Sequence, residues 1–77
     1  MLAIPKGLKE ELWGVLELAD KDEEEAKYRL EVSLIFFYNL GECGKSQKID
    51  EAVMRSLMGC QSVGQLRWMI RNVLRSA

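Results

Sequence analysis

The chain has 77 residues, of which 48% are hydrophobic and 30% charged, a composition typical of one small globular domain and not of a disordered chain. Eleven basic and twelve acidic residues give a net charge of −1, so the chain as a whole is not an obvious nucleic-acid binder. A domain of this size buries only about 60% of its unfolded surface, so its stability depends on covering a few apolar faces well.

Charge is distributed unevenly along the chain. Residues 1–31 contain nine acidic and five basic residues, whereas residues 32–77 contain three acidic and six basic ones. The resulting net charges of −4 and +3 have two interpretations. The two halves attract each other within one fold, or the asymmetry orients a partner.

The chain has no histidine and only two cysteines, Cys43 and Cys60. One possible bridge is not the disulfide framework of a small secreted domain, so we expect two free thiols and a cytoplasmic protein. Residues 1–6 do not resemble a signal peptide, and no apolar run approaches the ~20 residues of a membrane helix. Without histidine, the common acid–base and metal chemistries are missing. The sequence therefore predicts no cofactor, no metal, no membrane contact and no enzyme.

Helical spacing and capping signals predict a single all-α domain of four helices, at residues 5–19, 22–40, 47–58 and 63–76. In the first segment, Pro5 is suited to the first turn, and an apolar stripe follows. Its members are Leu8, Leu12, Val15, Leu16 and Ala19. Gly7 and Gly14 each weaken this helix by up to ~1 kcal/mol relative to Ala, so we expect it to depend on packing.

The second segment begins with an acidic cluster after Asp20 or Asp22, either of which can cap the helix. Its inner stripe consists of Ala26, Leu30, Leu34 and Phe37, and Gly41 is the expected left-handed residue after the helix. Residues 30–40 also alternate as a strand does, and a strand here would pair with its copy in a dimer. We prefer the helix, because no second strand exists in the chain and the acidic start suits a helix.

The third segment is expected to be capped by Ser46, with Ile49, Val53, Leu57 and Cys60 on its inner face. Ser62 and Gln65 form a capping box at the start of the fourth segment. The inner face of that segment consists of Val63, Leu66, Ile70, Val73, Leu74 and Ala77. The string Gly44-Lys45-Ser46 imitates part of a phosphate-binding loop, but the required preceding glycine is Asn39, so we interpret it as a turn.

The run Leu34–Tyr38 is apolar on every side, and most helices carry further apolar residues off their inner stripes. One copy of so short a chain has little material to cover them, so a two-fold homodimer with residues 22–40 near its axis is expected. The predicted interface consists of Ile35, Phe36, Tyr38, Met54 and Met58.

Arg67, Trp68, Arg71 and Arg75 lie together on the last helix, away from its inner face. Tryptophan and arginine dominate protein-binding hot spots, and the same residues suit phosphate contact and base stacking. The remaining alternative is that Trp68 is core and the arginines pair with the acidic half. The sequence favours a non-catalytic protein-interaction or regulatory module that binds itself and another protein, of a size common in bacteria and their phages. The alternative is a nucleic-acid-binding regulator that uses this basic face.

Overall fold

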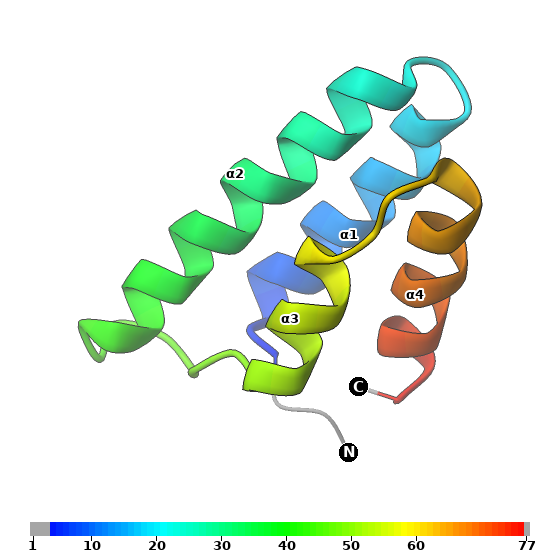
Figure 1. Cartoon of the computed structure of the whole chain (residues 1–77). Helices are drawn as coiled ribbons and strands as arrows, with labels where there is room; N and C mark the ends of the chain where they lie inside the picture. Colours follow the sequence, from blue (N-terminus) through cyan, green and yellow to red (C-terminus); the bar gives the residue numbers. More distant parts are fainter. Residues whose placement is uncertain (1–3, 77) are drawn as a thin grey trace.

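The longest element of the chain is α2 (Glu23–Glu42), whose 20 residues extend along most of the 34 Å length of the molecule. The computed structural model describes residues 4–76. The other helices in this range are α1 (Lys6–Ala19), α3 (Glu51–Met58) and α4 (Val63–Ser76). Figure 1 shows α2 running past the other three helices. The predicted all-α fold is confirmed, and the strand alternative for residues 30–40 is wrong, because these residues lie inside α2.

Local hydrogen bonds explain why α2 is helical despite its alternating apolar residues. The Asp22 carboxylate accepts a hydrogen bond from the Glu25 backbone N–H at 3.1 Å, so Asp22 caps the helix and Asp20 does not. Glu23 and Glu24 stand in the first turn, where negative charge meets the positive end of the helix dipole. A lone strand would leave its backbone groups without partners, whereas the helix satisfies them internally.

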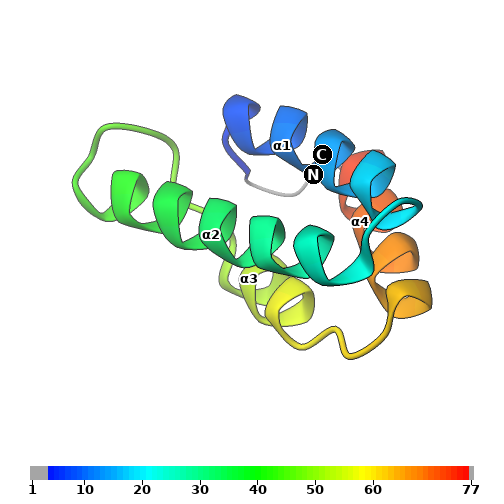
Figure 2. The same ribbon diagram turned by 90° about the horizontal axis from the view of Figure 1, so that it is seen from above.

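The core lies where α1 packs against α2 and α4, and where α3 packs against α4. Viewed from above, α1 and α3 lie on opposite sides of α2 (Figure 2). The buried apolar residues come from all four helices and the segments before α1 and α3. They are Ile4, Leu8, Leu12, Val15, Ala19, Ala26, Leu30, Leu34, Ile49, Val53, Leu57, Leu66, Ile70 and Val73. Most members of the predicted inner stripes therefore supply the core. Leu16, Phe37, Cys60 and Leu74 are only partly buried and pack against it, Val63 is half-buried outside it, and the predicted position of Ala77 lies outside the described residues.

The end of α2 differs from the prediction. Gly41 is a buried residue inside the helix, and Gly44 is the left-handed residue, with φ of 74°. The Lys45 N–H donates to the Leu40 carbonyl at 2.9 Å and the Gly44 N–H to the Gly41 carbonyl at 3.1 Å, the pattern of a Schellman motif. Gly41 serves close approach, because a β-carbon there would lie 3.0 Å from the Lys48 Cα.

Two helix starts differ from the prediction, and a third agrees with it. Pro5 has an extended ψ of 147° and is the N-cap of α1, not its first helical residue. α3 begins at Glu51 and not at 47, because the Asp50 carboxylate accepts from Ala52 N–H at 2.8 Å. The Ser46 hydroxyl donates to the Gln47 carbonyl instead of capping a helix. The Ser62 cap is confirmed by the bond from Gln65 N–H at 3.2 Å.

Polar contacts between the elements are few. The Glu11 carboxylate on α1 accepts hydrogen bonds from Arg29 and from the buried Ser33 on α2, both at 3.2 Å. Arg29 therefore pairs with a residue of α1 and not with a neighbour on its own helix. Among residues 4–76, no helix is both long and apolar enough to cross a membrane.

Candidate functional site

Two adjoining pockets between α2 and α3 form a groove along α2. The first, of about 280 Å³, is lined by Lys27, Leu30, Glu31, Leu57, Met58, Cys60 and Leu66. The second, of about 240 Å³, is lined by Tyr38, Ile49, Glu51, Met54, Arg55 and Met58. Met58 borders both pockets, and we call the two together the α2–α3 groove.

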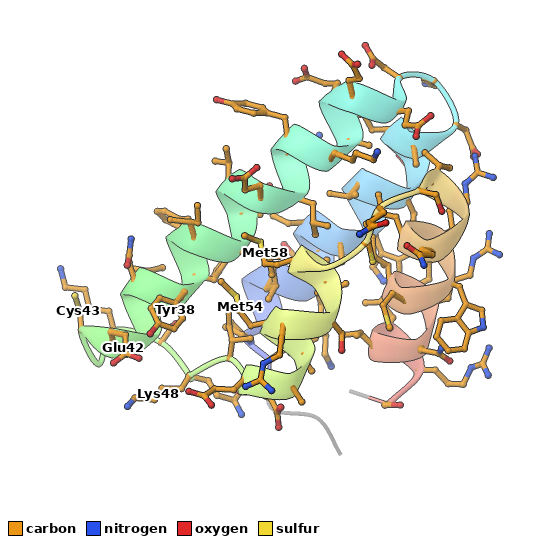
Figure 3. All side chains as sticks on the ribbon, in the orientation of Figure 1. Tyr38, Glu42, Cys43, Lys48, Met54 and Met58 are labelled. Carbon is orange, nitrogen blue, oxygen red and sulfur yellow. The ribbon has the colours of Figure 1, made fainter. Side chains whose placement is uncertain are left out.

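Three residues from the predicted dimer interface meet in this groove. Figure 3 shows Tyr38 on α2 and Met54 and Met58 on α3 directed into the space between the two helices. Tyr38 and Met58 are exposed, at 42% and 46%, whereas Met54 packs partly against the core. The floor of the groove is apolar, because Leu30 and Leu57 are buried beneath it.

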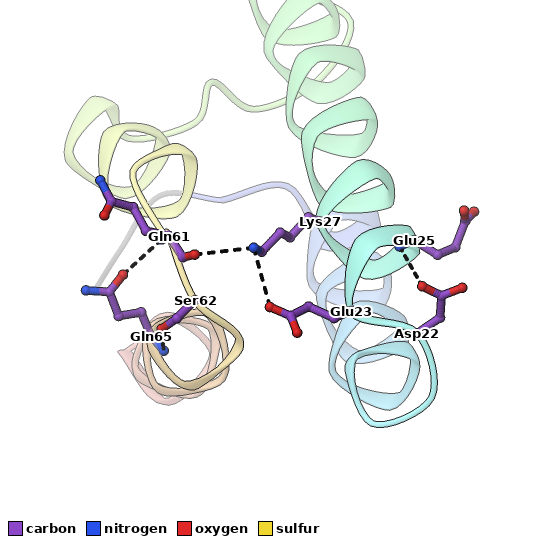
Figure 4. Close-up of polar contacts among 7 residues, drawn as sticks. All are labelled: Asp22, Glu23, Glu25, Lys27, Gln61, Ser62 and Gln65. Atoms are coloured by element: carbon purple, nitrogen blue, oxygen red, sulfur yellow. Dashed lines mark hydrogen bonds and ion pairs between the residues drawn. The ribbon is translucent and has the colours of Figure 1, made fainter.

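A lysine closes the end of the groove nearest the start of α2. The Lys27 ammonium donates to the Gln61 backbone carbonyl at 3.3 Å, and it pairs with Glu23 at 3.5 Å (Figure 4). The Gln61 N–H in turn donates to the Gln65 side chain at 2.9 Å. These bonds tie α2 to the turn between α3 and α4. At the other end, the segment between Glu42 and Asp50 joins the two helices covalently.

Two groups that line the groove have shifted pKa values. The carboxylate of Glu42 is the main cause that raises the pKa of Tyr38, with smaller contributions from loss of solvent and from Glu51. Burial raises the pKa of the Cys60 thiol, whose Sγ also contacts the Ser56 carbonyl at 3.4 Å. Both shifts keep these groups neutral near pH 7. The groove therefore presents uncharged sulfur, hydroxyl and aliphatic groups, with charged residues at its rim.

The remaining predicted interface residues lie outside the groove. Ile35 is 46% exposed on α2, one turn before Tyr38. Phe36 is 56% exposed, and its ring meets that of Phe37 edge to face with centroids 5.2 Å apart. At about 100° per residue, Phe36 lies on the α1 side of α2, and Tyr38 lies on the α3 side. The five predicted residues are all accessible in part, but they occupy more than one face.

The structure also separates the predicted residues of α4. Arg67 forms an ion pair with Asp20, which links the basic C-terminal half to the acidic N-terminal half. Its buried Nε has no hydrogen-bond partner among the described residues. Trp68 is 65% exposed and borders a shallow pocket next to Gly59 and Met69. Trp68 is therefore not a core residue, and Arg67 has a structural role in the fold.

Arg71 and Arg75 meet an aromatic residue that the sequence did not place with them. They line a pocket of about 330 Å³ with Leu74 and with Trp13 from α1. Trp13 is 58% exposed, and within residues 4–76 neither arginine pairs with a carboxylate. Only the packing of α1 against α4 creates this combination.

Within the described residues, no group of three or more cysteine or acidic side chains is arranged to hold a metal ion. Comparison of the chain with protein-family models, curated proteins and solved structures gives no significant match. The candidate site therefore rests on the chain's own geometry. The sequence identified Tyr38, Met54 and Met58 but not the groove, which depends on how α3 is placed beside α2.

Proposed function

We propose that this chain is a non-catalytic protein-interaction module that works as a homodimer. The observation that carries the proposal is the concentration of exposed apolar side chains on one helix. Eight large apolar residues are exposed among those described, and five of them lie on α2. These five are Tyr28, Val32, Ile35, Phe36 and Tyr38. Several large exposed apolar residues gathered on one helix are typical of binding surfaces, whereas single scattered residues are not.

The α2–α3 groove is the proposed site for a second protein, which contributes the apolar face of an amphipathic helix. The groove follows α2 from Lys27 to Tyr38, a length of about 16 Å at 1.5 Å per residue, or three helical turns. Helices bind such grooves through apolar anchors spaced three and four residues apart. Met54 and Met58 suit this role, because unbranched thioether side chains adapt to differently shaped partners.

The chemistry of the chain supports a binding role over catalysis. The chain has no histidine. The pKa values of Tyr38 and Cys60 are raised, so both groups are moved away from the ionised, reactive form at neutral pH. A cytoplasmic location is part of the same proposal, and it is supported by the two free thiols at Cys43 and Cys60.

A second candidate function is nucleic-acid binding, and one observation favours it. Arg71 and Arg75 have no ion pair within the described residues, and they stand beside the exposed ring of Trp13. Such a site offers phosphate contacts next to a stacking surface. The net charge of −1 and the use of Arg67 in the fold favour the protein-interaction role.

Two experiments test the proposal. Sedimentation equilibrium at micromolar concentration is expected to give twice the chain mass, and a single protomer would overturn the homodimer. For the groove, a photoreactive amino acid replaces Met58 in cells that make the protein. The groove proposal is supported if Met58 forms adducts with another protein and if Met54→Glu abolishes these adducts. It is refuted if adducts form only with a second copy of the chain, or if no adducts form. The same amino acid at exposed Glu10 is the control.

Fluorescence anisotropy with mixed single-stranded oligonucleotides tests the second candidate. Binding that weakens steeply with salt and is lost in Arg71→Ala and Trp13→Ala would establish it. No binding at low salt eliminates it.

A further inference from the structure

The outward face of α2 carries the spacing of a helix-pairing seam. Tyr28, Val32, Ile35 and Asn39 are separated by four, three and four residues. This is the repeat by which one helix lies along another. Tyr28, Val32 and Ile35 are 65, 47 and 46% exposed, and Asn39 is also exposed. The seam points away from the buried stripe of Ala26, Leu30 and Leu34, so nothing within the described residues covers it.

We infer that the α2 helices of two copies pair antiparallel through this seam, about a two-fold axis that passes between Val32 and Ile35. This arrangement rests on the proposed homodimer and specifies its geometry. Each residue then lies opposite the residue equally far from the axis. Val32 faces Ile35 of the other copy, and Tyr28 faces Asn39, so the phenol and the amide can hydrogen-bond at each end of the apolar centre.

Charge decides between the two possible directions. The start of α2 holds four acidic residues in sequence, Asp22, Glu23, Glu24 and Glu25. Parallel pairing would place these acidic clusters side by side, where like charges repel. Antiparallel pairing instead brings this acidic start near the end of α2, where Glu42 is paired with Lys48 at 3.8 Å and the exposed Lys45, just beyond the helix, has no ion pair within the described residues. It also opposes the two helix dipoles favourably.

The seam leaves the α2–α3 groove open. Tyr38 lies on the flank of α2 that faces α3, whereas the seam occupies the outer face. One protomer can therefore contact its copy through the seam and another protein through the groove. This assigns Ile35 to the dimer, and it assigns Tyr38, Met54 and Met58 to the second partner.

A native thiol tests the arrangement. Cys43 is exposed at the end of α2, and antiparallel pairing places it opposite Glu24 of the other copy. The parent for the experiment is Cys60→Ser, which keeps Cys43 as its only thiol. A short bismaleimide is expected to join two chains of the Glu24→Cys variant of this parent. The parent itself and a Glu17→Cys variant, with its thiol on α1, should remain single chains.

The outcomes separate the arrangement from the homodimer itself. Crosslinking of the parent through Cys43 alone would indicate parallel helices and overturn the inference. A dimer in sedimentation without the Glu24→Cys crosslink would overturn the arrangement and leave the homodimer standing. A monomer in sedimentation overturns both.

A second measurement does not depend on crosslinking geometry. Ile35→Ala removes an apolar contact twice in a two-fold interface, so we expect the dimer dissociation constant to rise at least tenfold, about 1.4 kcal/mol. Trp68→Ala truncates an even more accessible apolar residue, on α4, and should leave the constant unchanged. Equal effects of the two substitutions on the dimer dissociation constant would overturn the proposed pairing through the seam. Circular dichroism confirms that both variants remain helical.

Discussion

The ring of Phe37 occupies the space that a β-carbon on Gly7 would fill. Such a carbon would lie only 2.8 Å from Phe37 Cζ, a separation that requires one of the two to move. Gly7 therefore makes room for the Phe37 ring of α2 near the start of α1. The same ring also supports the exposed Phe36, which it contacts edge to face.

The two glycines of α1 are expected to respond oppositely to alanine. Gly7→Ala gains up to ~1 kcal/mol of helix propensity. It also forces overpacking against Phe37, which typically costs ~1–3 kcal/mol, so we expect a net loss of stability of about 1 kcal/mol. At Gly14 the nearest atom is the Arg29 guanidinium nitrogen at 3.4 Å, an ordinary contact with a flexible group. Gly14→Ala should therefore stabilise the protein. Urea unfolding measures the stability of both variants. A gain in stability for both would contradict the close approach of the Phe37 ring to Gly7. Adding Phe37→Leu to the Gly7→Ala variant should relieve the overpacking and restore part of the lost stability.

Glu11 contacts both Ser33 and Arg29, and we expect the loss of these two contacts to cost different amounts of stability. Ser33 is buried, so Glu11→Ala leaves a buried hydroxyl without its acceptor, at a cost of about 1–3 kcal/mol. The Arg29 pair is partly exposed and contributes less than about 1 kcal/mol, because solvent screens it. Ser33→Ala removes the unsatisfied group, so the Glu11→Ala/Ser33→Ala double variant should be more stable than Glu11→Ala. Thermal unfolding of the unchanged protein, the two single variants and the double variant tests this. Strictly additive losses of stability would disprove the coupling between Glu11 and Ser33.

Periodicity in the sequence predicted most of the fold, because each helix buries a stripe that is complete within its own segment. The sequence alone predicts the burial of Leu8, Leu12 and Val15 in this way, and it also predicts the Ser62 cap. The loop between α2 and α3 could be predicted less well from the sequence. Ser46 and Asp50 are both good caps, and the choice between them depends on where the chain leaves α2. Gly41 and Gly44 are likewise both plausible terminators, and only the approach of Lys48 distinguishes their roles.

The candidate site was predictable only in part, because it depends on contacts between segments distant in sequence. Trp13 and Arg75 are more than sixty positions apart, and they meet through the packing of α1 against α4. No local pattern contains that pairing. The seam on α2 is different, since its four-three-four spacing is present in the sequence. The apolar run Leu34–Tyr38 obscured it, because an all-apolar block has no visible outer face.

Cys60 is expected to react with alkylating reagents only at high pH. Burial raises its thiol pKa above the ordinary value of 9.0, so less thiolate is present at any given pH below the midpoint. In a Cys43→Ser variant, the rate of reaction with iodoacetamide should rise with pH to a midpoint above 9.0. Exposed Cys43, measured in Cys60→Ser, serves as the accessible comparison. After unfolding in urea, the Cys60 midpoint should fall towards the ordinary value. An unchanged midpoint would show that burial does not protect this thiol.

Tyr38 provides a direct electrostatic probe of the end of the α2–α3 groove. The carboxylate of Glu42 disfavours a second negative charge nearby, so it raises the pKa of Tyr38 above the ordinary value of 10.0. Glu42→Gln removes that charge and should lower the pKa, whereas Glu51→Gln should have a smaller effect. A Tyr28→Phe background leaves Tyr38 as the only tyrosine, and near-ultraviolet absorbance of the phenolate then gives the midpoint directly. Equal shifts in the two variants would contradict the dominance of Glu42. Because the phenol stays neutral until well above physiological pH, this end of the groove remains suited to an apolar partner, and binding there should not vary between pH 6 and 8, roughly the range in which histidine switches act.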